Sequence, residues 1–361
     1  MLLENAKVFH GPARYWCYFF KHDSPSGRAT LDVPPTWWPA LILMKRRCIQ
    51  FESDTLRKFT PRNCYLIGVS GGRDSVLLLY WLVELGYRNL IVCHLNHQLR
   101  GRSSQADAHF VEKLAGKYDV GFDLGLANVR ALAKKKNMSI ETAAREARFA
   151  FFAKTARRRN CRTIFLAHHA DDLAETFLLN LFRGAGSTGL AAMREISTRR
   201  IEDVELTIVR PFLHVWRKEI DHHVRDHRIK FREDATNNNI NPLRNRIRHR
   251  IIPYLEKTLG RNIRQNIWRT AMIAAEEEKW IESDLPGSID ADLSVAKLRA
   301  LPIALQRRAI LKWLRAQDIS DVGFDAVERV RSMADRHALI AKVNLPRDRH
   351  ARRRTGKIFI E

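Results

Sequence analysis

A glycine-rich segment at residues 70–75 has the residue types and the spacing that phosphate binding requires. The apolar run from Leu66 to Val69 stops at Ser70-Gly71-Gly72-Arg73-Asp74-Ser75, and a second apolar run begins at Val76. This pattern predicts a buried strand, a glycine loop and the first turn of a helix. Glycines let backbone N–H groups come close to a phosphate, and a helix N-terminus attracts negative charge. An ordinary glycine turn with a capping Ser or Asp is the alternative, but the position of the loop directly after a strand favours a phosphate site.

Asp74 has a different role in this loop from the glycines. A carboxylate is a poor direct partner for phosphate, so we expect Asp74 to contact a magnesium ion or the first turn of the helix. Ser70 and Ser75 add hydroxyl donors. The loop is not a Walker motif, because no lysine follows Gly72.

A second polar segment follows a predicted strand at 163–167. It reads His168-His169-Ala170-Asp171-Asp172-Leu173-Ala174-Glu175-Thr176. Asp172 and Glu175 share one side of the first turn of the predicted helix. If these acids only complement the helix dipole, replacing them costs about 1 kcal/mol or less per residue. Beside a phosphate loop in the same sheet, we expect instead that both acids and Asp74 hold magnesium. The histidines suit substrate positioning or packing better than zinc, since no cysteine lies nearby.

Two helical segments carry arginines that could reach a phosphate. In the predicted helix 139–159, Arg145 lies one turn after Glu141, and Arg148 lies one turn further on. An ion-paired, solvated stripe is the alternative to a contact with a nucleotide or RNA. The segment Arg244-Asn245-Arg246-Ile247-Arg248-His249-Arg250 is densely basic and contains no acid, which favours phosphate binding. The dinucleotide-like pattern at 184–189 follows a helix rather than a strand, so it predicts a flexible loop.

Strand and helix patterns alternate from residue 64 onward, which predicts an α/β fold with a parallel sheet covered by helices on both faces. Ligands in such sheets lie outside the carboxyl ends of the strands, so Ser70 and His168 are expected to face one crevice. From residue 258 the pattern is mostly helical, and an arginine-rich tail covers 347–354. Expected strands are 66–69, 89–95, 121–126, 163–167 and 206–209, and expected helices are 104–118, 139–159, 171–183, 216–228, 243–252, 260–283, 291–316 and 325–334.

Composition points to a polyanionic partner. The chain has 361 residues, 45% of them hydrophobic, and a formal net charge of +23, with a pI near 10.3. Such an excess predicts nucleic acid before membrane as the partner. Five cysteines without a C-x-x-C pair argue against a disulfide framework, a zinc ribbon or an iron–sulfur site, and fit a reducing cytoplasm. No stretch near the start is long enough for a signal-peptide core or a membrane span.

Residues 1–43 differ from the rest of the chain. They carry scattered aromatic residues and prolines without a sustained period, and only four basic and three acidic residues, so the charge excess lies almost entirely in 44–361. We expect this extension to lie outside the native enzyme, with Met44 as a sensible start; the alternative is a small appended segment that packs on the domain. The predicted domains are therefore 44–257 and 258–361.

Taken together, these segments resemble the tRNA(Ile)-lysidine synthetases, which belong to the N-type PP-loop ATP pyrophosphatases. The resemblance covers about 64 to 260 and includes segments 94–100, 139–148 and 183–190 besides those at 70–75, 168–176 and 244–249, in family order. Leu173 stands where the family commonly has Gln, which removes one polar contact and leaves the acids in place. Residues 1–43 have no counterpart in the family, and 258–361 match it only loosely.

The resemblance implies an α/β fold in which a parallel-sheet PP-loop domain, similar to the adenine nucleotide alpha hydrolases, precedes a smaller, mostly helical domain. It also implies a reaction: ATP adenylates the carbon-2 oxygen of the wobble cytidine in the isoleucine tRNA with anticodon CAU. Free L-lysine then displaces AMP, so that AUA is read as isoleucine. The implied cofactors are ATP and Mg²⁺, and a homodimer is left open.

The same resemblance assigns roles to residues of this chain. The expected catalytic and magnesium-binding residues are Asp74, Asp172 and Glu175. The expected ATP-binding residues are Ser70, Gly71, Gly72, Arg73, Asp74, Ser75, Arg145 and His168. The residues expected to bind tRNA or phosphate are Arg148, Arg183, Arg244, Asn245, Arg246 and Arg248.

Two other functions remain open on the sequence. A PP-loop tRNA 2-thiolase is one, although thiolases with an iron–sulfur cluster need paired cysteines. A non-catalytic basic RNA-binding protein is the other, and the complete set Ser70, Asp74, Asp172 and Glu175 argues against it.

Overall fold

The computed structural model describes residues 53–99, 101–233, 243–285, 291–319, 322–338, 340–346 and 348–361. Two units are distinguished, Met1–Arg47 and Cys48–Glu361, and the second contains all of the described residues. The extension expected at 1–43 and the start expected at Met44 lie outside the described residues. No helix in the described ranges is long and apolar enough to cross a membrane.

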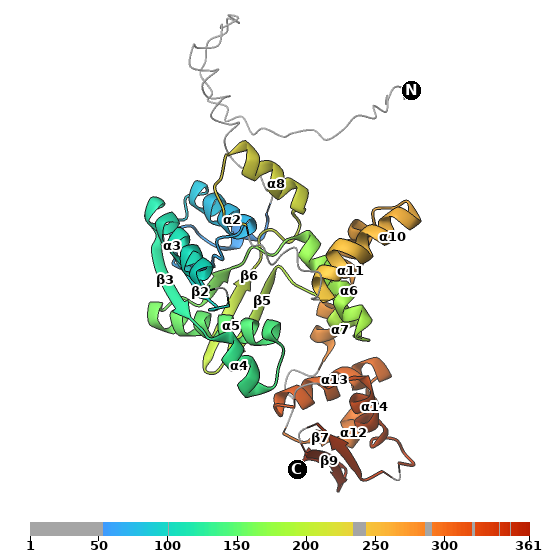
Figure 1. Cartoon of the computed structure of the whole chain (residues 1–361). Helices are drawn as coiled ribbons and strands as arrows, with labels where there is room; N and C mark the ends of the chain where they lie inside the picture. Colours follow the sequence, from blue (N-terminus) through green and yellow to red (C-terminus); the bar gives the residue numbers. More distant parts are fainter. Residues whose placement is uncertain are drawn as a thin grey trace, which may run out of the picture. The chain divides into compact units, whose positions relative to one another are not determined.

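A six-stranded sheet forms the centre of the larger domain (Figure 1). Its order is β3-β2-β1-β4-β6-β5, and only β5 runs antiparallel to its neighbour. The strands are β1 (Tyr65–Gly68), β2 (Leu90–Asn96), β3 (Gly121–Leu126), β4 (Thr163–Phe165), β5 (Ile196–Ile201) and β6 (Val204–Val209). The mostly parallel sheet predicted from the alternating pattern is therefore confirmed.

Helices cover both faces of this sheet, as expected. Successive side chains of β1 point to opposite faces: Leu66 belongs to a buried cluster with Phe152 of α5, whereas Ile67 belongs to a cluster with Trp81 of α2. The helical elements are η1 (Leu56–Lys58), α2 (Arg73–Glu84), α3 (Arg102–Lys117), α4 (Val129–Lys136), α5 (Ile140–Arg159), α6 (Ala170–Phe182), α7 (Ser187–Leu190), α8 (Arg217–Asp226), α9 (Leu243–Arg246), η3 (Ile247–Ile251), α10 (Ile252–Leu259) and α11 (Ile263–Asp284).

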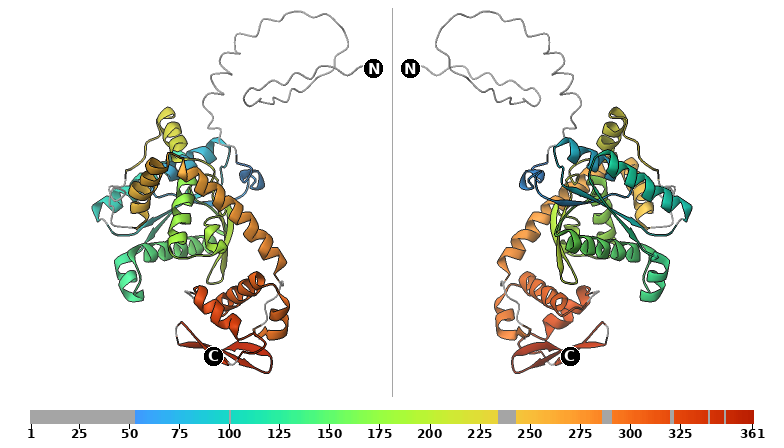
Figure 2. Two further views of the ribbon diagram at one scale, coloured as in Figure 1. Left: turned by 90° about the vertical axis from the view of Figure 1, so that its right-hand side faces the viewer. Right: turned by 90° about the vertical axis from the view of Figure 1, so that its left-hand side faces the viewer.

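The long helix α11 packs along the larger domain (Figure 2). It contacts α6 and α7, and its Ala271 shares a buried cluster with Leu173 and Phe177 of α6. A separate core cluster begins at Leu285 and extends to Ile358. The domain boundary expected between 257 and 258 stays a prediction.

The C-terminal domain is less helical than expected. Its helices α12 (Val295–Ala300), α13 (Ile303–Ala316) and α14 (Phe324–Ser332) accompany an antiparallel sheet of β7 (Leu293–Ser294), β8 (Lys342–Leu345), β9 (Arg349–Arg354) and β10 (Lys357–Ile360). The arginine-rich tail is largely strand β9. Ala351 is fully buried while Arg352 and Arg354 are exposed, so the strand alternates, but its one small apolar residue gives little hydrophobic signal.

Candidate active site

The loop after β1 leaves the N-terminus of α2 open. Gly72 is the N-cap residue and makes no side-chain cap, while Gly71 has φ +92°, a conformation that favours glycine. The hydroxyl of Ser75 accepts a hydrogen bond from the Ser70 N–H at 3.2 Å and donates one to the Gly72 carbonyl at 2.9 Å. These bonds fix the shape of the loop. The first-turn N–H groups of α2 are thus available to an anion.

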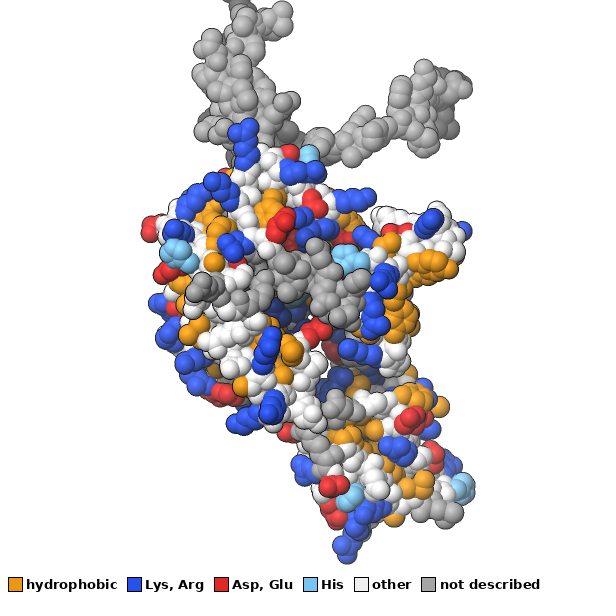
Figure 3. Space-filling view, in the orientation of Figure 1, with side chains coloured by type: hydrophobic (Ala, Val, Ile, Leu, Met, Phe, Trp, Pro, Cys, Tyr) orange, Lys and Arg blue, Asp and Glu red, His pale blue; other side chains and the backbone are white. Residues whose placement is uncertain are grey.

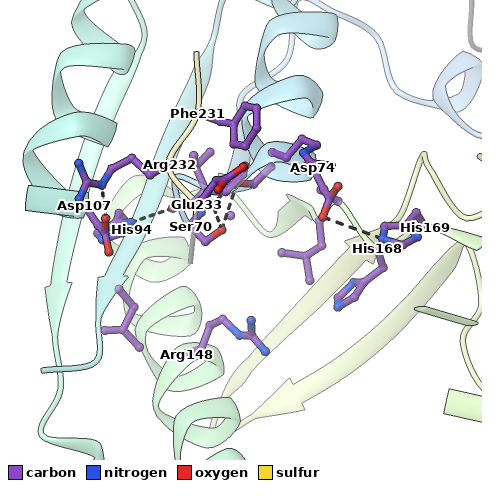
Figure 4. Close-up of a pocket in the computed structure, with 18 of the residues that line it drawn as sticks. Ser70, Asp74, His94, Asp107, Arg148, His168, His169, Phe231, Arg232 and Glu233 are labelled. Atoms are coloured by element: carbon purple, nitrogen blue, oxygen red, sulfur yellow. Dashed lines mark hydrogen bonds and ion pairs between the residues drawn. The ribbon is translucent and has the colours of Figure 1, made fainter. Parts of the chain in front are cut away.

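This loop opens on a cavity of about 1020 Å³ at the carboxyl ends of β1, β2 and β4 (Figure 4). Ser70 and His168 both line it, as the strand pattern predicted. Its volume suits a nucleotide-sized ligand. The lining comes mainly from 68–70, 72–75, 93–97, 166–169 and 231–233, with Arg148, Glu175, Arg217, Arg248 and Arg264.

The two adjacent histidines have opposite electrostatic environments. Burial lowers the pKa of His168 to about 3, so its ring is neutral, and no described residue forms a hydrogen bond with its buried Nδ1. Burial also opposes the charge on His169, but the carboxylates of Asp172, Asp171 and Asp74 raise its pKa above the ordinary value. His169 Nε2 lies 3.5 Å from Asp172 and 3.9 Å from Asp74. A neutral ring therefore lines the cavity beside a ring whose positive charge is favoured by the surrounding carboxylates.

Asp74 is held from α8. Its Oδ2 accepts a hydrogen bond from Arg217 at 2.9 Å, while Asp221 pairs with Arg73 and Arg217. The Oδ1 atom of Asp74 is buried without a hydrogen-bond partner in the described part of the chain. Burial raises the pKa of Asp74, and the nearby His169 and Arg217 oppose that effect. One carboxylate oxygen therefore remains for a cation or a donor from a ligand.

Asp172 and Glu175 are paired with arginines. Arg244 donates to Asp172 Oδ1 at 2.9 Å and to Glu175 Oε2 at 2.8 Å. Arg248 donates to Glu175 Oε1 at 2.5 Å and to Oε2 at 3.0 Å. Asp172 also accepts a bond from the backbone N–H of His169 at 3.1 Å. Burial opposes ionisation of Asp172, yet His169 and the two arginines hold its pKa well below the usual range. The oxygens of both acids are thus largely occupied by arginine donors.

Comparison with known proteins agrees with this geometry. A model of the PP-loop domain matches residues 44–255, and a model of the TilS substrate binding domain matches residues 293–359. The tRNA(Ile)-lysidine synthase of Chlorobaculum tepidum is 31% identical over 285 residues, which are 76% of this chain and 83% of that protein. The chain belongs to the tRNA(Ile)-lysidine synthase family. The resemblance found in the sequence is confirmed.

Other members of the family are longer. The tRNA(Ile)-lysidine synthase of Geobacter sulfurreducens is 37% identical over 321 residues, which are 85% of this chain and 66% of that protein. The chain spans 60% of the Solibacter usitatus protein. Among solved structures, the U34-tRNA thiolase NcsA from Methanococcus maripaludis has a TM-score of 0.49 and 16% identity, covering 70% of this chain and 81% of that one. That likeness is too distant for an argument about function.

A lysidine synthase family member is expected to use magnesium, and the site fits this ion in part. Asp74 offers one buried oxygen beside the phosphate loop that no described residue contacts by a hydrogen bond, and Mg²⁺ is commonly held by one or two carboxylates together with substrate phosphates. The oxygens of Asp172 and Glu175 already accept bonds from arginines. Among the described residues, no group of three or more His, Cys, Asp or Glu could hold a metal ion. The site joining all three acids stays a prediction, and the geometry favours Asp74.

The remaining residues expected to bind ligands lie in different places. Arg148 and Arg248 line the cavity with the loop, whereas Arg145, Arg183 and Arg246 are exposed and outside its lining. Arg244 lies against the acids, and Asn245 is outside the lining. Gly71 is also outside the lining, but its carbonyl accepts a bond from the Arg232 N–H at 3.0 Å. Their expected roles stay predictions.

Several lining residues were missed from the sequence. Arg217 reaches Asp74 and, through its backbone N–H, Asp171 at 2.9 Å. Arg264 of α11 donates to Asp171 at 3.3 Å, so Asp171 joins three helices. Phe231 lies under the guanidinium of Arg73 at 4.9 Å. The acids at 171–175 have no arginine or lysine beside them in the sequence, which was a signal that basic partners were needed. Those partners lie far away in the sequence.

Proposed function

We propose that this protein ligates lysine to carbon 2 of the wobble cytidine in the CAU-anticodon isoleucine tRNA, with ATP converted to AMP and pyrophosphate. The observation that carries the proposal is the uncapped N-terminus of α2, which opens on a cavity of about 1020 Å³ in a chain of the lysidine synthase family. Anions bind at such helix ends. ATP use follows from the PP-loop domain that matches 44–255.

The first step forms an adenylated cytidine. The O2 atom of the base attacks the α-phosphorus of ATP, the α–β bridging bond breaks, and pyrophosphate leaves. The loop 70–75 holds the leaving phosphates through backbone N–H groups and the hydroxyls of Ser70 and Ser75. The base must leave the stacked anticodon loop to reach the cavity. Neutral His168 lines the cavity, and its Nδ1 has no partner within the described part of the chain, so it provides a hydrogen-bonding group for the base or the adenylate.

The second step joins lysine to the base. The ε-amine attacks carbon 2, the C2–O bond to AMP breaks, and the amine loses a proton. Adenylation is needed because a carbonyl oxygen is a poor leaving group and AMP is a good one. Asp74 is the residue that we assign to magnesium, which neutralises phosphate oxygens when bound.

Asp172 and Glu175 act in this proposal together with Arg244 and Arg248. The acids fix both guanidinium groups, and Arg248 and Glu175 line the cavity. Fixed cations near a reacting phosphate stabilise developing charge without reorganisation. The catalytic role predicted for the acids is thus proposed to be exerted largely through the arginines.

The tRNA partner is supported by charge and by the second domain. Lys and Arg side chains are spread over the face seen in Figure 3, and the net charge is +23. A substrate-binding domain model matches 293–359. We propose free L-lysine as the second substrate and the cytoplasm as the location, where tRNA and lysine are both present. A homodimer stays a prediction that light scattering can test.

Mass spectrometry of the nucleosides tests the proposal. Purified protein, ATP, lysine and the tRNA transcript should give lysidine, with one pyrophosphate released for each lysidine formed. The matched control is the same transcript with uridine in place of the wobble cytidine, which should give neither product. Formation of 2-thiouridine, or tRNA binding without any pyrophosphate release, would overturn the proposal in favour of the two alternatives.

A further inference from the structure

Three arginines form a positive cluster at the edge of the cavity. Arg145 and Arg148 lie one turn apart on α5, and Arg199 lies on β5. The guanidinium of Arg199 is 4.2 Å from the centre of the Phe149 ring, and that of Arg145 is 5.5 Å from the same centre. We call Arg145, Arg148 and Arg199 the rim arginines.

Among the described residues, the rim arginines form no direct pair with an acid, although Glu141 and Glu146 lie near enough to act on them electrostatically. No ion pair or hydrogen bond joins any of them to a carboxylate within the described ranges of the chain, and Glu146, the acid next to Arg145 on α5, pairs with Lys136 at 2.7 Å. The Nε atom of Arg148 is buried and has no hydrogen-bond partner among the residues that the structure describes. Burial and the charges of Arg145, Arg244 and Arg199 lower the pKa of Arg148 to about 10. Like charges held together in this way are costly unless an anion binds between them.

The positions of the three side chains indicate which anion this is. Arg148 lines the cavity and reaches into it from α5, on the far side from Ser70 and Asp74 (Figure 4). Arg145 is exposed and is not part of the lining. The cluster therefore runs from the cavity wall to the protein surface. In the proposed reaction, the loop 70–75 binds the phosphates of a small nucleotide. A nucleic acid that inserts one base into the cavity instead leaves its backbone phosphates at the cavity opening.

We propose that the rim arginines bind the RNA backbone phosphate next to the nucleotide whose base enters the cavity. This site rests on the proposed function for the identity of that base. Arginine suits it because its planar fork binds phosphate through two hydrogen bonds. The ring of Phe149 contacts the guanidinium groups of Arg145 and Arg199 through cation–π interactions, which orient both groups before RNA arrives.

Arg199→Gln tests the site, with Arg200→Gln as the matched control. Arg200 is the next residue on the same strand, but it is exposed and donates to the Glu202 carbonyl at 3.3 Å. Filter binding of the tRNA transcript at several salt concentrations gives the affinity and its salt slope. Arg199→Gln should weaken binding about tenfold and reduce the slope of log K against log salt by about 0.7 to 0.9, as for one lost phosphate contact. Arg200→Gln should change affinity less than about twofold.

Two further measurements distinguish a site for an RNA phosphate from a site for the triphosphate of ATP. Since Arg199→Gln removes a repulsive charge, its stability to urea should equal or exceed that of the wild type, and its affinity for ATP alone should be unchanged. Weaker ATP binding with normal tRNA binding would assign the cluster to the triphosphate and overturn the proposal, as would an unchanged salt slope. If the wild type makes no lysidine while the slope still falls, the proposed reaction fails and the phosphate site stands.

Discussion

Replacing Glu175 with Gln should destabilise the protein far more than a helix-dipole role predicts. Glu175 is 1% exposed and accepts bonds from Arg244 at 2.8 Å and from Arg248 at 2.5 and 3.0 Å. A glutamine keeps one acceptor oxygen and places an amide donor against a guanidinium. At least one bond is therefore lost, and the others lose the help of the negative charge.

The cost can be worked out from these contacts. A hydrogen bond to a charged group contributes about 1.5–3 kcal/mol, and a neutral acceptor gives roughly half as much. The side chains of Arg244 and Arg248 are 28% and 30% exposed, so water compensates part of the loss. The expected destabilisation is about 2–3 kcal/mol, somewhat below the 3–5 kcal/mol typical of breaking a fully buried pair.

Urea unfolding of the full chain measures this effect. Glu202→Gln is the control, because that carboxylate is 78% exposed and lies 3.8 Å from Arg157, and it should change stability by less than about 0.5 kcal/mol. The double variant Glu175→Gln/Arg248→Gln should lose less than the sum of the single changes. A loss below about 1 kcal/mol for Glu175→Gln, with additive changes in the double variant, would refute the ion-pair network and return the acid to the helix-dipole role.

Three further outcomes are expected. Asp74→Asn should reduce pyrophosphate release at least about a hundredfold without loss of stability to urea. Stability should be retained because burial already disfavours the charged form of Asp74 by raising its pKa, and because Arg217 still has Asp221 as an ion-pair partner at 3.3 Å. Near-normal turnover would contradict the assignment of Asp74. Gly71→Ala should cost about 1–2 kcal/mol and weaken ATP binding in calorimetry, because φ is +92° and a Cβ would lie 3.4 Å from Val111. The pKa of His169 is raised. The stability that His169 gives the protein, measured by urea unfolding against His169→Gln, should therefore be complete below about pH 6.5 and decline as the pH rises through the folded-state pKa. A difference between the two proteins that grows with pH would contradict this.

The central sheet and its loop were predictable because strand and helix patterns alternate along the chain and β1 is a short apolar run directly before the glycine loop. β3 begins and ends at the expected residues, Gly121 and Leu126, and α5 begins one residue after Ser139. Ser139 caps that helix by accepting a bond from the Thr142 N–H at 3.1 Å, which is a local signal. The edge strand β5 was missed because its pattern mixes Ser, Thr and Arg with few apolar residues.

The ion pairs of the site were not predictable, because they join distant segments. Arg244 and Asp172 are 72 residues apart in the sequence. A dense basic segment without acids reads as a phosphate-binding surface, yet two of its arginines satisfy buried carboxylates. The available signal was that the two arginines and the two acids have the same spacing. Arg244 and Arg248 lie about one helical turn apart, and so do Asp172 and Glu175. Nothing in the sequence pairs these two segments with each other.

Helix α8 connects the phosphate loop to a group of aromatic rings suited to spectroscopy. Arg217 at its start contacts Asp74 and Asp171, so a change in charge at the loop acts on the first turn of the helix. Further along α8, the ring of His223 lies 6.0 Å from those of His222 and His227. Their ring resonances in NMR spectra should therefore shift when nucleotide enters the cavity, which gives a readout of occupancy in the unlabelled, unmutated protein.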